Sequence, residues 1–547
     1  MYDILFRGCR VVDGSGAAAF PADVAVAGGR IVRVVAALDG PAATLVDAHG
    51  LCLAPGFIDP HTHSDLTLLA DGRAESRIRQ GITTEVTGNC GSSAAPLGGA
   101  AIAETVAEAS QFGVAVDWRD MGEYLDRLRR AGSAVNVVPL AGHNTVRGCV
   151  LGYDDAQPDA EQQAAMERLT AAAIEQGARG LSSGLFYPPG SYAGSDEVAA
   201  LTRAARRAAE SDGAAAAATG SSAARAGGRV VYASHIRDEA SGVLPAVEEA
   251  IAIGERAGVP VEVSHLKLSG PRAQRLLPEL LDVVAAAADR AVPVGFDLYP
   301  YTASGTWLIA LLPYPDQQGG AEAAAARLED PVVRARLRAD YAADRDGWEE
   351  RSGVDDWTRI VVGLCPGDEA ATGRSLAELG DERDRDPLDV AFDLIGASRG
   401  LADATFHDQS EDVVRALVAH PTVAIGSDGW SVAPDGRLAD LAEHPRTYGT
   451  FPRVLGRYVR ELGVLRLEEA VRKMTSLTAE RFGLADRGVI RAGACADLVL
   501  FDPSTVVDTA DFADPKRFPE GIHCVTVNGR VVLRDGARTA ELPGVIL

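Results

Sequence analysis

A chain of 547 residues, 47% hydrophobic and 24% charged, has the composition of a globular protein of more than one domain. Its 77 acidic and 53 basic residues give a formal net charge of −24, which argues against nucleic acid and gives no support for an anionic membrane as a partner. The seven cysteines are odd in number and lack a CxxC pair, so no disulfide framework is predicted. Without a signal peptide or a membrane-length apolar run, we expect a cytoplasmic protein.

Both ends of the chain predict short β-strands. Residues 1–54 alternate apolar and polar side chains between Gly and Asp turns, and the same texture returns in residues 483–547. Neither end is long enough to enclose a core of its own. We therefore expect the two ends to combine into one small β-sandwich domain.

Between the ends, residues 55–482 alternate strand-like apolar runs with helical segments, the signature of parallel βα units. Eight such runs occur, the number that a closed (β/α)8 TIM-like barrel requires. They are LCLAPGFI, TTEVTGN, NVVPLAG, RGLSSGL, VVYASHI, VEVSHLK, PVGFDLY and TVAIGSD.

Two connections in this region stand out. The one between the seventh and eighth runs, about residues 302–421, is far longer than a crossover helix needs. Because such an insert would overhang the C-terminal face of a barrel, where active sites lie, we expect it to act as a lid. Residues 211–228 are low in complexity and predict a flexible surface loop.

Histidines follow several of the predicted strands. His61 and His63 occupy positions i and i+2 of an extended segment, so both imidazoles can reach one metal ion, although an isolated HxH is also typical of a surface turn. His235 and His265 end the fifth and sixth runs, and Asp428 ends the eighth. Chance explains this placement poorly, and we expect these side chains to converge on one mouth.

Cys90 ends the second run, in TTEVTGNCG. A lone cysteine is usually a small buried hydrophobe. A thiolate at a strand end beside His61 and His63 would instead suit zinc, and the glycines around it permit close approach of the backbone. We favour the ligand interpretation.

These motifs resemble the N-acyl-D-amino-acid deacylase (D-aminoacylase) family of the metal-dependent amidohydrolase superfamily, and the resemblance runs nearly end to end. The segments that carry it are PGFIDPHTHSD, TTEVTGNCG, SSGLFYPPGSYA, SHIRDE, SHLKLSG, DLYPYTAS, GSDG, HPRTYGTFPRVLGRYVRE and TSLTAERFGL with DRGVIRAGACADLVLFDP.

The resemblance implies a metal site and a catalytic residue. Cys90, His235 and His265 would hold one tightly bound Zn2+. His61 and His63, with Cys90 bridging, would form a second, weaker site that can be empty. Asp428 would bind metal as well and would be the catalytic carboxylate. It would take the proton of the attacking water and return it to the leaving amine.

The substrate side is predicted from position and from the resemblance. Lys267 lies two residues beyond His265, so its ammonium should enter the same mouth. By resemblance, Lys267, Tyr299 and Arg446 would hold the α-carboxylate of the acylated amino acid, although Arg446 could instead form a loop-stabilising ion pair. His143 would orient a metal ligand or the barrel mouth.

The resemblance implies zinc-dependent hydrolysis of N-acyl-D-amino acids, small-molecule substrates. The alternatives are another amidohydrolase activity, such as cyclic-amide opening or cleavage of a dipeptide with a C-terminal D-residue, and a non-catalytic scaffold. Gly305 stands where many family members carry a second Ser, and the stretch from Asp428 to Arg446 is longer than in the best-known D-aminoacylases. Because of both departures, the sequence does not define which substrate side chain the pocket accepts. It does not define the number of subunits either, and a homo-oligomer is one alternative.

Overall fold

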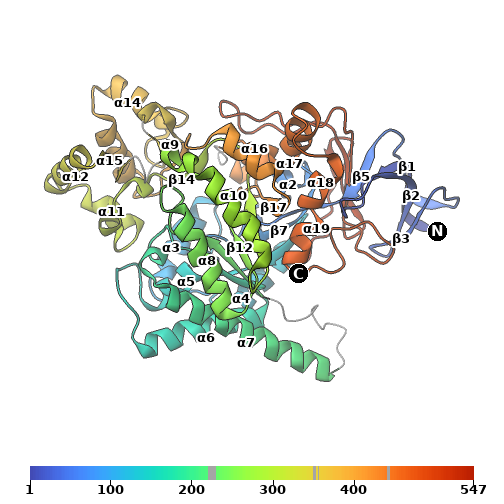
Figure 1. Ribbon diagram of the computed structural model, residues 1–547, viewed down its shortest axis with the longest axis horizontal. Coiled ribbons are helices and arrows are strands. Elements are labelled where there is room, and N and C mark those ends of the chain that lie inside the picture. Colours follow the sequence, from blue (N-terminus) through green and yellow to red (C-terminus); the bar gives the residue numbers. More distant parts are fainter. Residues whose placement is uncertain (220–229, 346, 349–352, 355, 440–443) are drawn as a thin grey trace.

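A computed structural model describes residues 1–219, 230–345, 347–348, 353–354, 356–439 and 444–547. Along the longest axis of the molecule, the N-terminal strands lie at one end (Figure 1). At the other end lie the helices α11 (Ala321–Arg327), α12 (Pro331–Ala343), α14 (Leu376–Arg383) and α15 (Pro387–Ala397). Parallel strands and the helices that cover them fill the space between.

The two ends of the chain share one nine-stranded sheet, in which β5 pairs with β1 on one side and β18 on the other. Some of the apolar side chains of these strands form a separate core with Ile490, Ala494 and Ala496, and the others, such as Val499 and Phe501, pack into the main core. The strands are β1 (Tyr2–Val11), β2 (Phe20–Ala27), β3 (Arg30–Val35), β4 (Ala42–Asp47), β5 (Cys52–Pro55), β18 (Leu498–Phe501), β19 (Ile522–Val527), β20 (Arg530–Arg534) and β21 (Ala537–Arg538).

The predicted apolar runs of the central region form two parallel sheets, ordered β6-β7-β8 and β9-β10-β11-β12-β13-β17. An isolated parallel bridge between Thr62 and Gly429 links the segments that follow β6 and β17. The strands are β6 (Phe57–Asp59), β7 (Ile82–Thr87), β8 (Asn136–Pro139), β9 (Ala141–Gly142), β10 (Gly180–Gly184), β11 (Val231–His235), β12 (Val261–Val263), β13 (Val294–Leu298) and β17 (Val423–Ile425). Buried on both faces, they lack the alternation of the terminal strands.

Amphipathic helices cover these strands. In α4, buried residues recur at helical spacing, namely Met121, Tyr124, Leu125 and Leu128, and the Asp120 side chain caps the first turn. The longer helices between the parallel strands are α3 (Ala101–Gln111), α4 (Met121–Ala131), α5 (His143–Val150), α6 (Ala160–Gln176), α7 (Ser195–Thr219), α8 (Val243–Ala257), α10 (Leu277–Ala286) and α16 (Glu411–Ala419). Later helices include α17 (Arg446–Arg453), α18 (Leu467–Lys473) and α19 (Ser476–Arg481).

The long connection after β13 builds a small unit with its own hydrophobic core, which runs from Leu308 to Phe406. Its antiparallel sheet has the order β14-β16-β15. The elements are β14 (Ser304–Trp307), α11 (Ala321–Arg327), α12 (Pro331–Ala343), β15 (Ile360–Val362), α14 (Leu376–Arg383), α15 (Pro387–Ala397) and β16 (Asp403–Phe406). Helix α16, by contrast, packs Val413 and Leu417 into the main core. We call residues 304–406 the insert.

The low-complexity stretch is partly helical, because α7 continues to Thr219, where we expected a loop from residue 211. Alanine-rich sequence favours helix over loop. The rest of the stretch, to residue 228, lies outside the described residues. No helix of the described part of the chain is long and apolar enough to cross a membrane.

Candidate active site

The ends of five parallel strands bring the predicted ligands to one place. The side chains come from the segments that end or follow β6, β7, β11, β12 and β17, and all but His63 are buried. They are His61, His63, Cys90, His235, His265 and Asp428.

One group of ligand atoms comes from Cys90, His235 and His265, which lie within 4.8 Å of one another. The Cys90 Sγ is 3.3 Å from Nε2 of His265. Both ring nitrogens of His235 are buried without a hydrogen-bond partner among the described residues. Buried polar atoms are rarely left unpaired, so these nitrogens fit a missing ligand. A sulfur and two imidazoles are donors that Zn2+ prefers.

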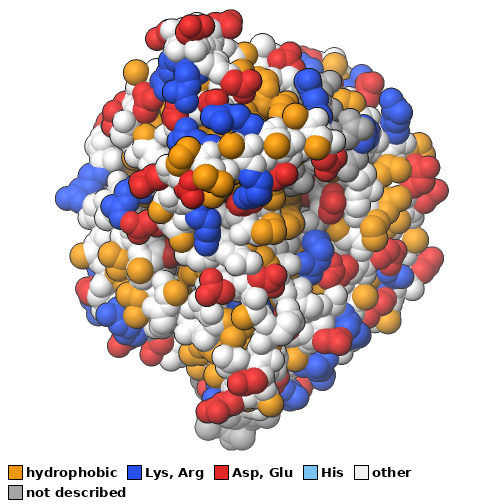
Figure 2. Space-filling view, turned by 90° about the vertical axis from the view of Figure 1, so that its left-hand side faces the viewer, with side chains coloured by type: hydrophobic (Ala, Val, Ile, Leu, Met, Phe, Trp, Pro, Cys, Tyr) orange, Lys and Arg blue, Asp and Glu red, His pale blue; other side chains and the backbone are white. Residues whose placement is uncertain are grey.

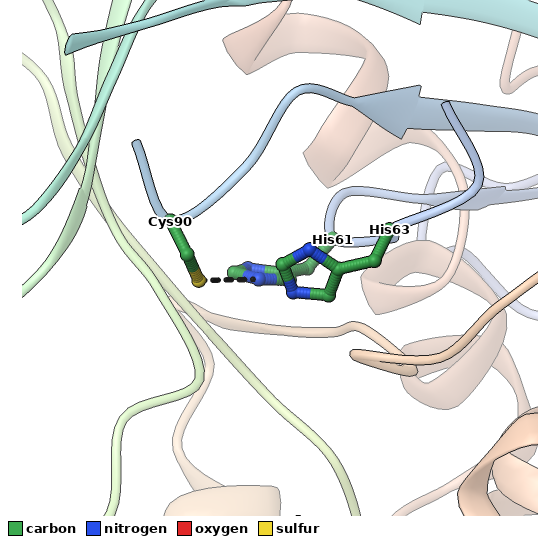
Figure 3. A group of neighbouring side chains, drawn as sticks. All are labelled: His61, His63 and Cys90. Carbon is green, nitrogen blue, oxygen red and sulfur yellow. Dashed lines mark hydrogen bonds between the residues drawn. The ribbon is translucent and has the colours of Figure 1, made fainter. Parts of the chain in front are cut away.

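A second group shares Cys90 with His61 and His63, again within 4.8 Å. Figure 3 shows both imidazoles on one stretch after β6, with the Cys90 sulfur opposite, 3.3 Å from Nε2 of His61. Burial alone would raise the pKa of the Cys90 thiol, but the neighbouring imidazoles of His61 and His265 hold this pKa well below its ordinary value. The sulfur is therefore suited to serve as a thiolate ligand.

The backbone is strained where these ligands stand. Cys90, His265 and Asp428 have φ values of 51°, 36° and 49°, in the left-handed region that favours glycine. Each such residue costs about 1 kcal/mol or more unless its surroundings compensate. Strain at three of the converging residues is typical of a functional site.

Asp428 lies between the imidazoles and a guanidinium. One carboxylate oxygen is 3.0 Å from Nε2 of His63 and 3.5 Å from Nε2 of His61, and the other accepts from Nη1 of Arg446 at 2.7 Å. Burial would raise the pKa of Asp428, but Arg446 and His63 hold it well below its usual range. The carboxylate is thus ionised and close to both metal-ligand groups.

The three predicted substrate-binding residues also come together. The Tyr299 ring lies 4.8 Å from the Arg446 guanidinium carbon and 5.7 Å from the Lys267 ammonium. The Lys267 ammonium lies 2.5 Å from Oε1 of Glu239 and 2.8 Å from Nδ1 of His265. Arg446 forms an ion pair with the predicted catalytic residue Asp428, and it also lines the same cavity as Lys267.

His143 lies apart from this group. It starts α5, where Nε2 pairs with Glu197 at 2.8 Å and Nδ1 lies 3.4 Å from Asn144. None of its hydrogen bonds among the described residues reaches a predicted metal ligand. Its neighbour Asn144 bonds the carbonyls of Gly184 and Tyr187, so this region supports the loop after β10.

Two buried aspartates beneath the ligands were missed from the sequence. Asp297, on β13, accepts from the His265 amide at 2.8 Å and lies 3.6 Å from Nδ1 of His61. Asp59, on β6, accepts from the amides of His61 and Ser427. A carboxylate inside an apolar strand was the available signal, because a buried acid needs partners.

A profile of the amidohydrolase family matches residues 44–533. Three proteins of Alcaligenes xylosoxydans xylosoxydans align with the whole chain: N-acyl-D-aspartate deacylase (38% identical, 95% of its length), D-aminoacylase (37%, 97%) and N-acyl-D-glutamate deacylase (36%, 96%).

Solved structures agree. N-acyl-D-glutamate deacylase from Bordetella bronchiseptica, in complex with zinc and a phosphonate mimic of the tetrahedral intermediate, superposes with a TM-score of 0.81 at 34% identity, covering 100% of this chain and 99% of that one. A D-aminoacylase structure concerned with its binuclear metal centre, with one-metal activation and second-metal attenuation, gives the same score and identity over both full chains.

A mixed α/β fold that gathers histidine and cysteine side chains at its strand ends, and that matches a zinc-bound deacylase over its full length, is that of a metal-dependent hydrolase. More particularly, the chain belongs to the amidohydrolase family, and its full-length relatives are N-acyl-D-amino-acid deacylases.

Proposed function

We propose that this protein is a zinc-dependent N-acyl-D-amino-acid deacylase, which hydrolyses the amide bond to release a carboxylate and a free D-amino acid. The observation that carries the proposal is the convergence of Cys90, His235 and His265 beside an ionised Asp428, above which Lys267 and Arg446 supply positive charge. The D configuration is supported by the names of the three full-length relatives.

In this proposal Cys90, His235 and His265 hold the tight zinc, and His61 and His63 with Cys90 form the weaker site. The donor set fits the metal: one thiolate, buried imidazoles and ligand atoms close enough to share an ion. When bound, zinc supplies a Lewis acid that makes water acidic enough to attack near neutral pH and polarises the substrate carbonyl.

Asp428 moves the proton. Its ionised carboxylate accepts a proton from the attacking water and delivers it to the amide nitrogen as the C–N bond breaks. His63 and Arg446 orient the two carboxylate oxygens through contacts of 3.0 and 2.7 Å. The same contacts keep the Asp428 pKa low, so the base is present across the neutral range.

Lys267, Tyr299 and Arg446 position the substrate. A guanidinium binds a carboxylate through two parallel hydrogen bonds, and Lys267 adds a point charge. The Tyr299 ring lies against both cations and fixes the space between them. Holding the α-carboxylate there places the scissile amide near Asp428. His143 acts indirectly, by supporting the loop after β10.

The architecture of the proposal is a closed (β/α)8 barrel. It is supported by the parallel order of the two central sheets and by the Thr62–Gly429 bridge between the segments after β6 and β17. The terminal sheet is a second domain, and the insert is a lid, since side chains of β14 and its neighbours line the cavity over the ligands.

The test is a screen of N-acetyl-D- and N-acetyl-L-amino acids with zinc-loaded protein, scored by release of free amine. We expect release from D-substrates, with little from their L-enantiomers. Release only from cyclic amides, or from no substrate at all, would contradict the proposal.

A further inference from the structure

The sequence identity to the named relatives does not show which amino-acid side chain the substrate of this protein carries. The relatives named for N-acyl-D-aspartate, for D-amino acids in general and for N-acyl-D-glutamate are 38%, 37% and 36% identical to this chain. The cavity has a volume of about 1130 Å³, which leaves room around an acetylated amino acid for a large side chain or acyl group.

One wall of the cavity is aromatic and apolar. Phe186 and Tyr187, in the loop after β10, lie 5.5 and 4.8 Å from the His235 ring, and Phe186 lies 6.4 Å from Tyr314. Trp307 and Ile309 of the insert continue this wall. All five side chains are partly exposed, and all five line the cavity. We call these five residues the aromatic wall.

The outer face of the insert differs from this inner side. Acidic and basic side chains are interspersed with apolar ones across it, as Figure 2 shows, and no area of one sign dominates. Scattered apolar residues on an outer surface are ordinary. Apolar side chains gathered in a cavity, such as the aromatic wall, instead indicate a surface that binds a ligand.

The charge of the cavity is the second observation. Among the described residues that line it, nine are acidic and four basic. Of the four, Arg237 is bound to Glu249 and to two backbone carbonyls, and Arg399 pairs with Glu322 at the exposed rim. The remaining two, Lys267 and Arg446, are the cations assigned to the α-carboxylate.

A second carboxylate in the substrate would thus enter a cavity whose lining has more acidic than basic residues. Among the described cations of the lining, Lys267 and Arg446 serve the α-carboxylate, while Arg237 and Arg399 are held by Glu249 and Glu322, so none is left for a second carboxylate. Placing an unpaired charge in such a site is costly. An apolar side chain would instead cover the aromatic wall and remove its surface from water.

We propose that the preferred substrates are N-acyl-D-amino acids with uncharged, apolar side chains, an inference that rests on the proposed function. N-acyl-D-aspartate and N-acyl-D-glutamate are then poor substrates. The aromatic wall binds the apolar part of the substrate, and the acidic lining excludes the second carboxylate.

The experiment compares kcat/KM for N-acetyl-D-leucine, -phenylalanine, -glutamine, -glutamate and -aspartate on the zinc-loaded enzyme. We expect the apolar substrates to exceed glutamate by about a hundredfold or more. Glutamine, which has nearly the same shape as glutamate, should fall between them. A preference for glutamate or aspartate would overturn this inference and leave the deacylase proposal intact. No release from any D-substrate would overturn both.

A charge added to the wall tests the cause. Ile309→Arg should raise the ratio of kcat/KM for glutamate over glutamine by about tenfold or more. Val332→Arg is the matched control, because Val332 lies on α12, is 73% exposed and is not part of the cavity lining. An equal change in both variants, or no change in either while glutamate stays a poor substrate, would mean that the wall charge does not set the specificity.

Discussion

Two regions face each other across the cavity, and they are built differently. At the ends of the parallel strands the lining is ionisable and mostly buried, and backbone strain occurs at Cys90, His265 and Asp428. In the insert the lining side chains are partly exposed and mostly uncharged, over a hydrophobic core separate from the main one. The strand ends thus keep the candidate metal-binding and catalytic side chains in a fixed geometry. The insert supplies a cavity wall whose side chains can differ between enzymes with different substrates.

The largest effect is expected where the two ligand groups meet. Cys90→Ala removes the sulfur shared by both groups, so zinc should fall from roughly one tightly held ion per chain to a trace, and activity should fall to background. Elemental analysis and amine release measure the two quantities. Cys149→Ala is the control, because the Cys149 thiol hydrogen-bonds the Pro96 carbonyl, belongs to neither ligand group and should be dispensable. A Cys90→Ala enzyme that keeps its zinc would refute this ligand assignment.

Asp428→Asn comes next. The amide keeps the shape of the carboxylate but cannot take up a proton, so kcat should fall by about a hundredfold or more while tight zinc is retained. Asp435→Asn makes the same chemical change at an exposed residue seven positions later and should leave kcat near normal. Near-normal kcat in the Asp428 variant would place the proton transfer elsewhere.

Arg446→Lys should have a smaller effect, mainly on KM. A lysine cannot reproduce the two parallel hydrogen bonds to a carboxylate, and the lost contact to Asp428 can lower kcat as well. A KM increase of about tenfold is expected. The measurement compares N-acetyl-D-amino acids with their carboxamides in parent and variant.

The two comparisons separate the two roles of Arg446. The parent should discriminate strongly between acid and amide, and the variant only weakly. If both prefer the acid by the same factor, Arg446 acts only through its ion pair with Asp428, and Lys267 becomes the leading residue for the carboxylate.

The contrast between the strand ends and the insert also explains which site residues could be predicted from the sequence. His61, Cys90, His235 and His265 could be selected because each directly follows an apolar run, and parallel strands place their ends at one edge of a sheet. The structure does bring them together. Strand periodicity is a local property, so no knowledge of the loops was needed.

Contacts that depend on loop paths could not be predicted in this way. The Arg446–Asp428 pair and the aromatic wall join segments whose relative position is set by the insert and by the loop after β10. Nothing in the spacing of Phe186 and Tyr314 places them side by side. Residues 411–419 fell within the insert predicted from the sequence, because the length of a connection does not show which core a helix joins. In the structure, Val413 and Leu417 pack into the main hydrophobic core.

The smallest predicted effect tests whether the two regions are also separate in stability. Two capping boxes of the same design occur, Ser375 with Glu378 at the start of α14 in the insert, and Asp159 with Gln162 at the start of α6. Replacing either cap by Ala should cost about 1 kcal/mol of local stability. Because the insert has its own core, Ser375→Ala should speed amide hydrogen exchange in α14, α15 and β15 and leave β11 and β12 unchanged. Asp159→Ala should speed exchange in α6 and leave the insert unchanged. If both variants accelerated hydrogen exchange in β11 equally, the chain would open as one unit. The insert could then not move as a lid without also loosening the strand ends that carry the predicted metal ligands.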